Sequence, residues 1–382
     1  MTVLLYAIFL GACPHQTLPA LPDDPTAKLW IAGYRTLAST FTERNLTLGV
    51  WYPARGTGRS AAPCSWDLRE HMPREQSRKI PNDDNPQPSY ANCYLGLDAD
   101  IRYGPYPLVI FVHGTAGFRT QSAHLLIHLA SRGFVVVAAD YPGIQLYDEL
   151  NKADHPLQPQ PKADQAGDTR LIQRYLEENI DKDPRLHFLA NRTEPTNNAI
   201  IGHSAGGFAL HGLGDIAKVL VPMAASGIDN GTAGRVESTL VLGAMNDSIT
   251  GGLKLQGPGY DSSPTPKRLA MMTGLGHHFC SDMCWIGAKQ GGIVAIALRH
   301  GIFLAEAFKR LANDGCRFSN PDFSDPRRGW AFANYATSAV LEEVLMCDAQ
   351  GPAKMRRISS AINDTYLYRE ALTIELSGKD FR

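Results

Sequence analysis

Apolar residues in this chain are grouped into short runs, separated by polar segments rich in glycine and proline. Runs of five to seven apolar residues, bounded by turn signals, are typical of strands buried on both faces of a parallel sheet. We predict five such strands, at residues 107–112, 134–140, 219–225, 239–244 and 268–273, the last ending the sheet. A sixth, shorter apolar run, at 199–201 after two asparagines, comes directly before a glycine-rich turn.

Helical spacing of apolar residues appears between these strands. Ala123, Leu125, Ile127 and Leu129 mark a helix over 120–132, and further helices are predicted from Asp168, at 291–312 and at about 331–347. Alternating strands and helices predict an α/β fold with a mostly parallel sheet and right-handed crossovers. Residues 29–35 and 46–53 read as an antiparallel strand pair at the amino-terminal side.

The length of 382 residues is compatible with one enlarged α/β domain. We expect this domain to cover 28–382, with a polar insertion at about 56–104 and a helical carboxyl-terminal extension from about 314. The insertion has no apolar period, so we expect a solvated surface segment, with a lid as the alternative. Residues 251–266 are rich in glycine and proline and predict an irregular loop.

The first residues have the features of an export signal. Residues 3–10 are apolar but too few to cross a bilayer, and Leu10-Gly11-Ala12-Cys13 resembles a bacterial lipobox, in which the cysteine is lipidated. Residues 1–9 contain no lysine or arginine, unlike most signals, and a buried strand is the alternative. We expect 1–27 to be an export signal and tether, and the protein to be membrane-anchored through Cys13 or secreted.

The cysteines agree with export. Seven are present, and setting Cys13 aside leaves an even number, as expected for disulfides in an oxidising compartment. Fifteen pairings of the remaining six are possible. We expect Cys64 to pair with Cys93, because they bracket the polar insertion. The other four, which are Cys280, Cys284, Cys316 and Cys347, would then pair among themselves.

The net charge of the chain argues against nucleic acid as a partner. The formal net charge is −1, so the chain has no basic field for nucleic acid. An apolar content of 44% is ample for a large core.

The strongest chemical motif is Gly202-His203-Ser204-Ala205-Gly206. A Gly-x-Ser-x-Gly sequence between a strand and a helix is typical of a nucleophile elbow, which exposes the serine oxygen on a sharp turn. The glycines are needed where two backbones approach too closely for a Cβ. In such an elbow the Ala205 N–H points to the place where an oxyanion would form.

Several ordered motifs together resemble the α/β-hydrolase fold. Within it the chain is similar to the platelet-activating-factor acetylhydrolase, dienelactone-hydrolase-like and cutinase-like polyester hydrolase group. The motifs that carry the resemblance lie at 50–53, 113–120, 129–134, 202–207, 243–249 and 274–277.

The resemblance implies a catalytic triad in the chain order Ser, Asp, His. Ser204 would be the nucleophile and His277 its base, with the neighbouring His278 as a rival. Asp247 follows a predicted strand where the fold places its acid, and Asp229, after the preceding strand, is the alternative.

The resemblance also implies an oxyanion hole made by the main-chain N–H groups of Thr115 and Ala205. His113 and His203 are interpreted as supports of their turns. A metal cluster over 277–284 is disfavoured because its spacing fits no common zinc pattern. No turn motif presents Cys280 as a nucleophile.

These residues predict a serine hydrolase that cleaves carboxylic esters through an acyl-enzyme and needs no cofactor. The substrate would be a small-molecule or lipid ester, and we expect a monomer. Short or oxidised acyl chains on a phospholipid and polyesters both remain open. The alternatives are an acyltransferase or peptidase with the same triad, and a catalytically silent binding protein on the same scaffold.

Overall fold

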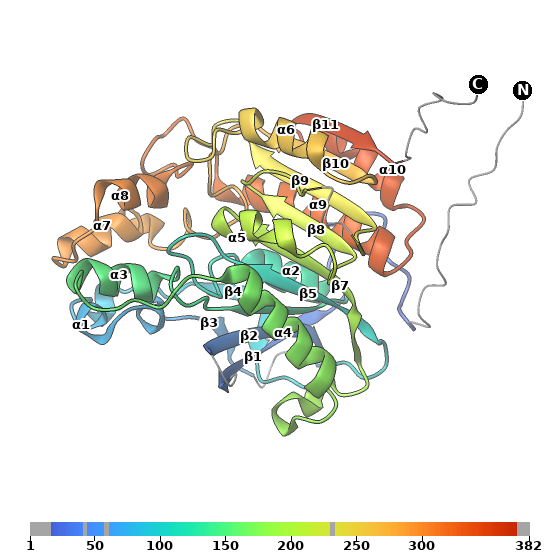
Figure 1. The fold of residues 1–382 in the computed structure, drawn as a ribbon, viewed down its shortest axis with the longest axis horizontal. Coiled ribbons are helices and arrows are strands. Elements are labelled where there is room, and N and C mark those ends of the chain that lie inside the picture. The colour runs from blue at the N-terminus through green and yellow to red at the C-terminus, as the bar shows by residue number, and fades with distance from the viewer. Residues whose placement is uncertain (1–16, 41–43, 57–60, 230–233, 373–382) are drawn as a thin grey trace, which may run out of the picture.

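The computed structural model describes residues 17–40, 44–56, 61–229 and 234–372 (Figure 1). They build an eleven-stranded sheet in the order β11-β10-β9-β8-β7-β5-β6-β2-β1-β4-β3. The strands are β1 (Ile31–Thr40), β2 (Asn45–Ala54), β3 (Pro63–Ser65), β4 (Ser89–Leu95), β5 (Tyr106–Val112), β6 (Val135–Ala139), β7 (Thr193–His203), β8 (Val219–Met223), β9 (Ser238–Ala244), β10 (Lys267–Met272) and β11 (Thr365–Ala371).

The centre of the sheet is parallel, as the apolar runs predict. Neighbouring strands from β10 through β9, β8, β7 and β5 to β6 all pair in parallel. Every residue of β5, β6, β8 and β9 is buried. The predicted antiparallel pair is also present, since β1 pairs with β2 and β2 pairs with β6. The α/β-hydrolase fold class expected from the sequence is therefore confirmed.

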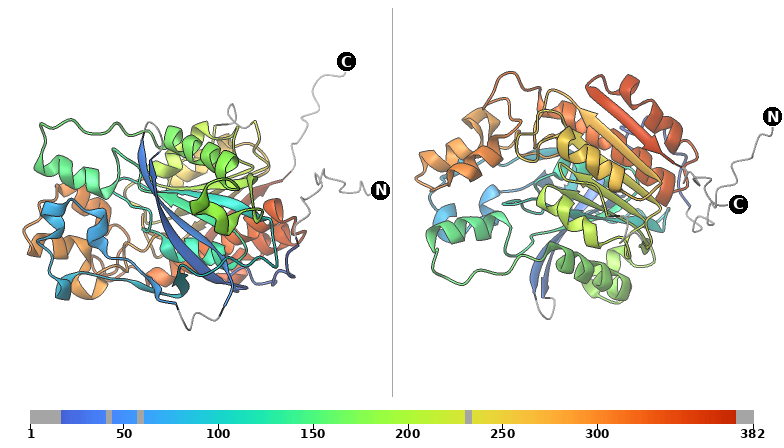
Figure 2. Two further views of the ribbon diagram at one scale, coloured as in Figure 1. Left: turned by 90° about the horizontal axis from the view of Figure 1, so that it is seen from below. Right: turned by 45° about the horizontal axis from the view of Figure 1, so that its top comes forward.

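Helices cover both faces of this sheet (Figure 2). They are α1 (Arg74–Ser77), α2 (Ala123–Ser131), α3 (Leu146–Asp154), α4 (Gln165–Asn179), α5 (Ala205–Phe208), α6 (Leu253–Ser262), α7 (Gly292–Arg299), α8 (Glu306–Asn313), α9 (Pro326–Leu345), α10 (Gly351–Arg356) and α11 (Ile358–Ala361). Successive side chains of a strand point to opposite faces. Val109 and Phe111 of β5 accordingly pack with α2 and α9, and Leu108 and Ile110 pack with α4.

A separate apolar cluster lies beside the main sheet. It joins residues of α3, α7 and α8 to Phe118, which follows β5, and to Met283, which lies beyond β10. In Figure 1 these helices gather with α1 at one end of the molecule. The segments that follow the carboxyl ends of the parallel strands are therefore covered by a separate layer of helices.

The polar insertion is less solvated than its composition predicts. It contains β3, α1 and β4, and β4 joins the sheet by pairing in parallel with β1. Leu68, Met72 and Ile80 are buried in the apolar cluster beside the sheet. The expectation of a purely solvated surface segment is wrong for these residues, because widely spaced apolar side chains suffice to bury a segment that has no regular period.

The long helix predicted over 291–312 is in fact two helices. Helix α7 ends at Arg299 and α8 begins at Glu306. Gly301 adopts a φ of 64° between them, a left-handed conformation that commonly ends a helix. The helix predicted at about 331–347 is present as α9, which begins earlier because Asp325 caps it through the N–H of Arg327.

Two elements were not predicted. Residues 251–266 contain helix α6 rather than an irregular loop. A Cβ on Gly259 of α6 would lie 2.0 Å from the backbone nitrogen of Gly227, so this glycine permits close packing. The sheet also continues past β10, because β11 pairs with it antiparallel at the edge. No residue of β11 is fully buried, and it therefore lacks the apolar run that identifies the central strands.

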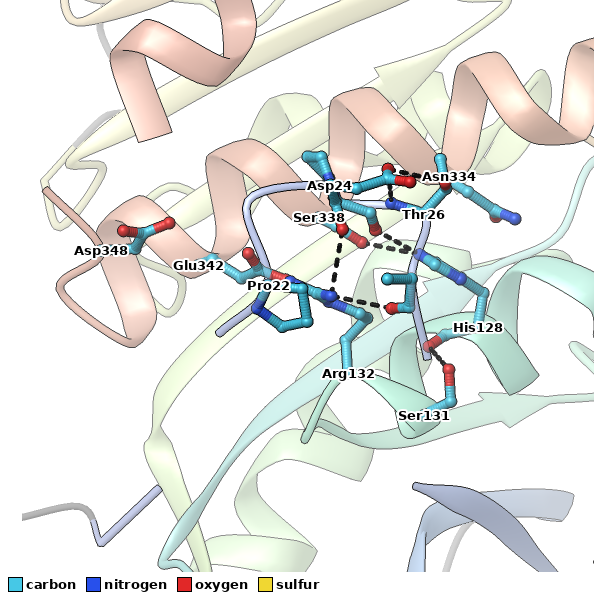
Figure 3. Close-up of polar contacts among 12 residues, drawn as sticks. Pro22, Asp24, Thr26, His128, Ser131, Arg132, Asn334, Ser338, Glu342 and Asp348 are labelled. Atoms are coloured by element: carbon cyan, nitrogen blue, oxygen red, sulfur yellow. Dashed lines mark hydrogen bonds and ion pairs between the residues drawn. The ribbon is translucent and has the colours of Figure 1, made fainter. Parts of the chain in front are cut away.

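The proline-rich tether is bound to the domain through buried polar contacts (Figure 3). Arg132, directly after α2, donates to the Ala27 carbonyl at 2.7 Å and to Glu342 of α9 at 2.6 Å. The Arg132 and Glu342 side chains are fully buried, and Lys354 forms a second ion pair with Glu342 at 3.2 Å. His128 contacts the Pro25 carbonyl at 3.0 Å. These contacts attach the described part of the tether to α2 and α9.

Two disulfides are present among the described residues. Cys64 pairs with Cys93, as expected, and Cys284 pairs with Cys316. Cys280 has a free, buried thiol, so the expectation that all four later cysteines pair among themselves is wrong. Disulfides are typical of exported proteins. Among the described helices, none combines the length and apolarity needed to cross a membrane.

Candidate active site

Ser204 lies on a sharp turn between β7 and α5. Its backbone has φ 55° and ψ −121°, a strained conformation for a non-glycine residue. A Cβ on Gly202 would lie 2.2 Å from the Gly206 carbonyl oxygen, and a Cβ on Gly206 would lie 2.2 Å from the Val112 carbonyl oxygen. Both glycines are therefore required by the close approach of the backbones, as an elbow demands.

A histidine and a carboxylate meet beside this turn. Asp247 follows β9, and His277 follows β10, the next strand of the sheet. The His277 Nδ1–H donates to the Asp247 carboxylate at 3.0 Å, and both side chains are fully buried. Parallel strands bring their carboxyl ends to one edge, which is why residues distant in sequence can pair here.

The Asp247 carboxylate is held in its charged form. Burial raises its pKa, but the hydrogen bond and charge of His277 and the bonds from Thr250 outweigh burial and lower the pKa to about 2. The Thr250 hydroxyl donates at 2.6 Å, and the N–H groups of Ile249 and Thr250 donate at 2.9 and 2.8 Å. A charged, fully hydrogen-bonded carboxylate can orient the imidazole and stabilise an imidazolium.

The other nitrogen of His277 is left unpaired in a residue that lines the Ser204 cavity. The Nε2 atom is buried and has no hydrogen-bond partner among the described residues. His277 and Ser204 line the same cavity, whose volume is about 20 Å³. The Ser204 hydroxyl does not hydrogen-bond to Nε2 in this structure, and in enzymes without substrate this contact is often long.

Apart from Ala116, the apolar side chains that line this cavity come from outside the motifs recognised in the sequence. These residues are Met283, which precedes a disulfide cysteine, and Phe308, Leu311 and Ala312 of α8. No described residue of the polar insertion lines the cavity. Helix α8 therefore covers the site, a position that the sequence prediction of one long helix did not reveal.

The predicted oxyanion donors have unused N–H groups. Neither the Thr115 N–H nor the Ala205 N–H donates a hydrogen bond to another described residue. Thr115 lines the cavity beside Ser204, and Ala205 is the first residue of α5. An unpaired N–H at the start of a helix is suited to bind developing negative charge.

The rival histidine is occupied by other partners. The His278 Nε2–H donates to the Leu311 carbonyl at 2.9 Å, and its Nδ1 accepts from Ser281 at 3.1 Å. Burial lowers the pKa of His278 to about 3. The partner of His277 is Asp247, not the alternative Asp229. This geometry favours His277 and Asp247 among the candidates.

His203 and His113 have the contacts of turn supports. His203 donates to the His277 carbonyl at 3.0 Å and accepts from Gln121 at 3.1 Å. His113 donates to the Gly114 carbonyl at 2.8 Å and accepts from the Tyr141 N–H at 3.1 Å. Burial lowers the pKa of His113 to about 4 and that of His203 well below its usual range, so both rings are neutral.

One carboxylate at the site was not predicted. Asp314, just past α8, accepts from the His277 N–H at 2.6 Å and from the Ser248 N–H at 3.3 Å. It therefore joins the loop of His277 to the loop that contains Asp247. A Cβ on Gly276 would lie 2.3 Å from the Asp314 carboxylate, so Gly276 makes this approach possible. Gly276 belongs to a motif that was recognised in the sequence, but no sequence signal identified Asp314 as its neighbour.

The segment 277–284 does not have the geometry of a metal site. No group of three or more His, Cys, Asp or Glu side chains within the described ranges is arranged to hold a metal ion. The Cys280 thiol is buried, and burial raises its pKa, which disfavours the reactive thiolate.

Comparisons with known proteins agree with the fold. The family model of platelet-activating factor acetylhydrolase, isoform II, matches residues 91–144. A ferulic acid esterase from Streptomyces cinnamoneus, solved at 2.4 Å, has a similar structure with a TM-score of 0.53 and 16% sequence identity. The alignment covers 85% of this chain and 92% of the esterase. No curated protein sequence matches the chain. The resemblance to acetylhydrolase-like α/β-hydrolases is therefore confirmed.

Proposed function

We propose that this protein is a carboxylic ester hydrolase that acts through an acyl-enzyme on Ser204. The observation that carries the proposal is the contact of His277 Nδ1 with Asp247, with Nε2 left unpaired in the cavity that Ser204 also lines. The acetylhydrolase family match and the esterase structural neighbour support the same reaction class.

In the proposed reaction, His277 Nε2 takes the proton of the Ser204 hydroxyl as its oxygen attacks the ester carbonyl. The N–H groups of Thr115 and Ala205 stabilise the oxyanion, and Asp247 stabilises the imidazolium. Collapse of the intermediate breaks the bond to the alcohol oxygen, which receives the proton from His277. Water then attacks the acyl-enzyme by the same route and releases the acid.

We further propose that the acyl group is short. The cavity beside Ser204 has a volume of about 20 Å³, little more than the space of one water molecule. Phe308 and Leu311 of α8 and Met283 close its apolar side. An acetyl group needs less rearrangement of these side chains than a long acyl chain.

The test is turnover of p-nitrophenyl esters from acetate to laurate by wild type, Ser204→Ala and Asp247→Asn. We expect acetate to have the highest kcat/KM. Ser204→Ala should lose at least about 10³-fold in kcat, and Asp247→Asn roughly 10³- to 10⁴-fold. Release that does not depend on Ser204 contradicts the proposal, and acyl transfer to an added alcohol or amine faster than hydrolysis favours the acyltransferase.

We also propose that the chain is exported, and that it is a monomer. The disulfides Cys64–Cys93 and Cys284–Cys316 support an oxidising compartment. The finer proposal, a lipid on Cys13 that tethers the protein to a membrane, concerns a residue outside the described ranges. The mass of the mature amino terminus in native material tests it, and an intact Met1 contradicts it.

A further inference from the structure

A second concave surface lies outside the Ser204 cavity. This groove has a volume of about 690 Å³, which is within the range of small-molecule binding sites. It shares no lining residue with the Ser204 cavity. Its walls are residues 85–88 of the polar insertion, residues 284–290, Arg317 with Phe318, and residues 325–327.

The groove carries a surplus of positive charge. Lys289, Arg317 and Arg327 line it, and Asp325 is the single carboxylate among the lining residues. Arg327 already pairs with Asp325 at 2.6 Å. Lys289 and Arg317 are exposed, and neither makes a hydrogen bond or ion pair with another residue that the structure describes, although the charge of Arg317 is close enough to Asp325 to help lower the pKa of that carboxyl. Two cations are therefore available to an anionic ligand.

Flat apolar side chains form part of the same surface. Trp285, Phe318, Pro86 and Pro88 all line the groove. The Trp285 ring is held by edge contacts with Tyr90 at 5.4 Å and with Trp330 at 5.6 Å between ring centroids. A ring fixed in this way can stack against a flat ligand face at low entropic cost.

The buried side-chain amide of Asn85 favours a ligand that also carries a hydrogen-bond donor. Asn85 lines the groove with only 7% of its surface exposed, and its side-chain oxygen accepts no hydrogen bond from the described residues. A buried acceptor without a donor is unfavourable, so a ligand that brings a hydroxyl would stabilise this position.

We propose that this groove binds a hydroxylated ring carboxylate. The carboxylate pairs with Lys289 and Arg317, the ring packs against Trp285 and the prolines, and a hydroxyl donates to Asn85. Arginine is suited to a carboxylate because its guanidinium donates two parallel hydrogen bonds. A uronic acid and a phenolic acid share this chemistry. The proposal is independent of the reaction at Ser204, since the two sites share no residue.

Calorimetric titration of the full chain tests the proposal with two matched pairs of probes. Methyl β-glucuronoside is compared with methyl β-glucoside, and 4-hydroxybenzoate with 4-hydroxybenzamide. We expect at least one carboxylate to bind about 10-fold more tightly than its neutral partner. The pair that shows this difference identifies the ligand as a sugar acid or a phenolic acid.

Substitution of the two cations that line the groove tests whether the carboxylate binds there. The double variant Lys289→Gln/Arg317→Gln should weaken carboxylate binding about 10-fold and leave ester turnover unchanged. Arg55→Gln, an exposed arginine outside the groove, is the matched control and should have no effect. Binding of wild type should also weaken between 0.05 and 0.5 M salt, because exposed charges are screened.

Three results would overturn the proposal. They are equal affinity for the charged and neutral probes, carboxylate binding that persists in the double variant, and no binding of either carboxylate to the wild-type chain.

Discussion

The main-chain N–H of His277 donates to the carboxylate of Asp314 at 2.6 Å, across 37 residues of sequence. The same carboxylate accepts from the N–H of Ser248, which follows Asp247. The imidazole and its acid are thus held by their side-chain contact and by a third residue that joins their loops. Asp314 follows α8, which also lines the Ser204 cavity.

Asp314→Asn is expected to lower kcat about 10- to 100-fold with little change in KM. An asparagine places an NH₂ group where one of the two backbone N–H groups now donates, so the loops separate and the imidazole shifts. Steady-state kinetics with p-nitrophenyl acetate measure the effect. The exposed Asp322, replaced by asparagine, is the control. A kcat within twofold of wild type in Asp314→Asn would show that the contact does not position His277.

Gly202→Ala is expected to destabilise the fold by about 1–3 kcal/mol or more, because the added Cβ would lie 2.2 Å from the Gly206 carbonyl oxygen. Urea unfolding measures the change. Gly212→Ala is the matched control, since no atom lies within 4 Å of its added Cβ. Equal stability of the two variants would argue against the tight elbow.

Loss of the Cys284–Cys316 disulfide is expected to reduce both stability and turnover. The bond closes a separation of 32 residues, for which the chain-entropy model gives about 3 to 4 kcal/mol. It also lies two residues from Asp314. The double variant Cys284→Ser/Cys316→Ser should therefore lose stability and kcat.

The control for this prediction is Cys64→Ser/Cys93→Ser. Its disulfide closes a similar separation of 29 residues, but neither of its cysteines is adjacent in sequence to a residue that lines the Ser204 cavity or lies near Asp314 in the chain. We expect a similar loss of stability in urea unfolding and an unchanged kcat. Equal kcat for both double variants at a temperature where both are folded would contradict the link to Asp314.

Stability is expected to fall as the pH drops below about 6.5. Burial lowers the pKa of His278 to about 3 and that of His113 to about 4. In the unfolded chain a histidine binds a proton near pH 6.5, so below that pH the unfolded state takes up more protons. The stabilisation is complete above about pH 6.5 and is lost progressively toward pH 3 to 4.

Urea unfolding at pH 7 and pH 5 measures this dependence, with an expected loss on the order of 1 kcal/mol for each buried histidine. His278→Gln should show a shallower decline than wild type. His187→Gln is the control, because His187 is exposed to solvent in the folded chain as well. A decline that is the same in wild type and His278→Gln would contradict the assignment.

Local sequence patterns determined the parallel centre of the sheet and the elbow. Strands β5, β6, β8 and β9 are buried on both faces, and such strands need continuous apolar runs that can be recognised without tertiary information. Gly202 and Gly206 were identifiable because a sharp strand-to-helix turn leaves no space for a Cβ. The position of Asp247 and His277 after successive predicted strands followed from the same pattern.

Only the tertiary structure decided how distant segments meet. It brought Asp314 to the His277 loop, placed α8 over Ser204, and closed the groove between residues 85–88 and 284–290. Edge strand β11 and helix α6 also escaped prediction, because each is stabilised by a partner far away in the sequence. A periodic pattern reports the environment along one segment, whereas these contacts depend on which segments pack together.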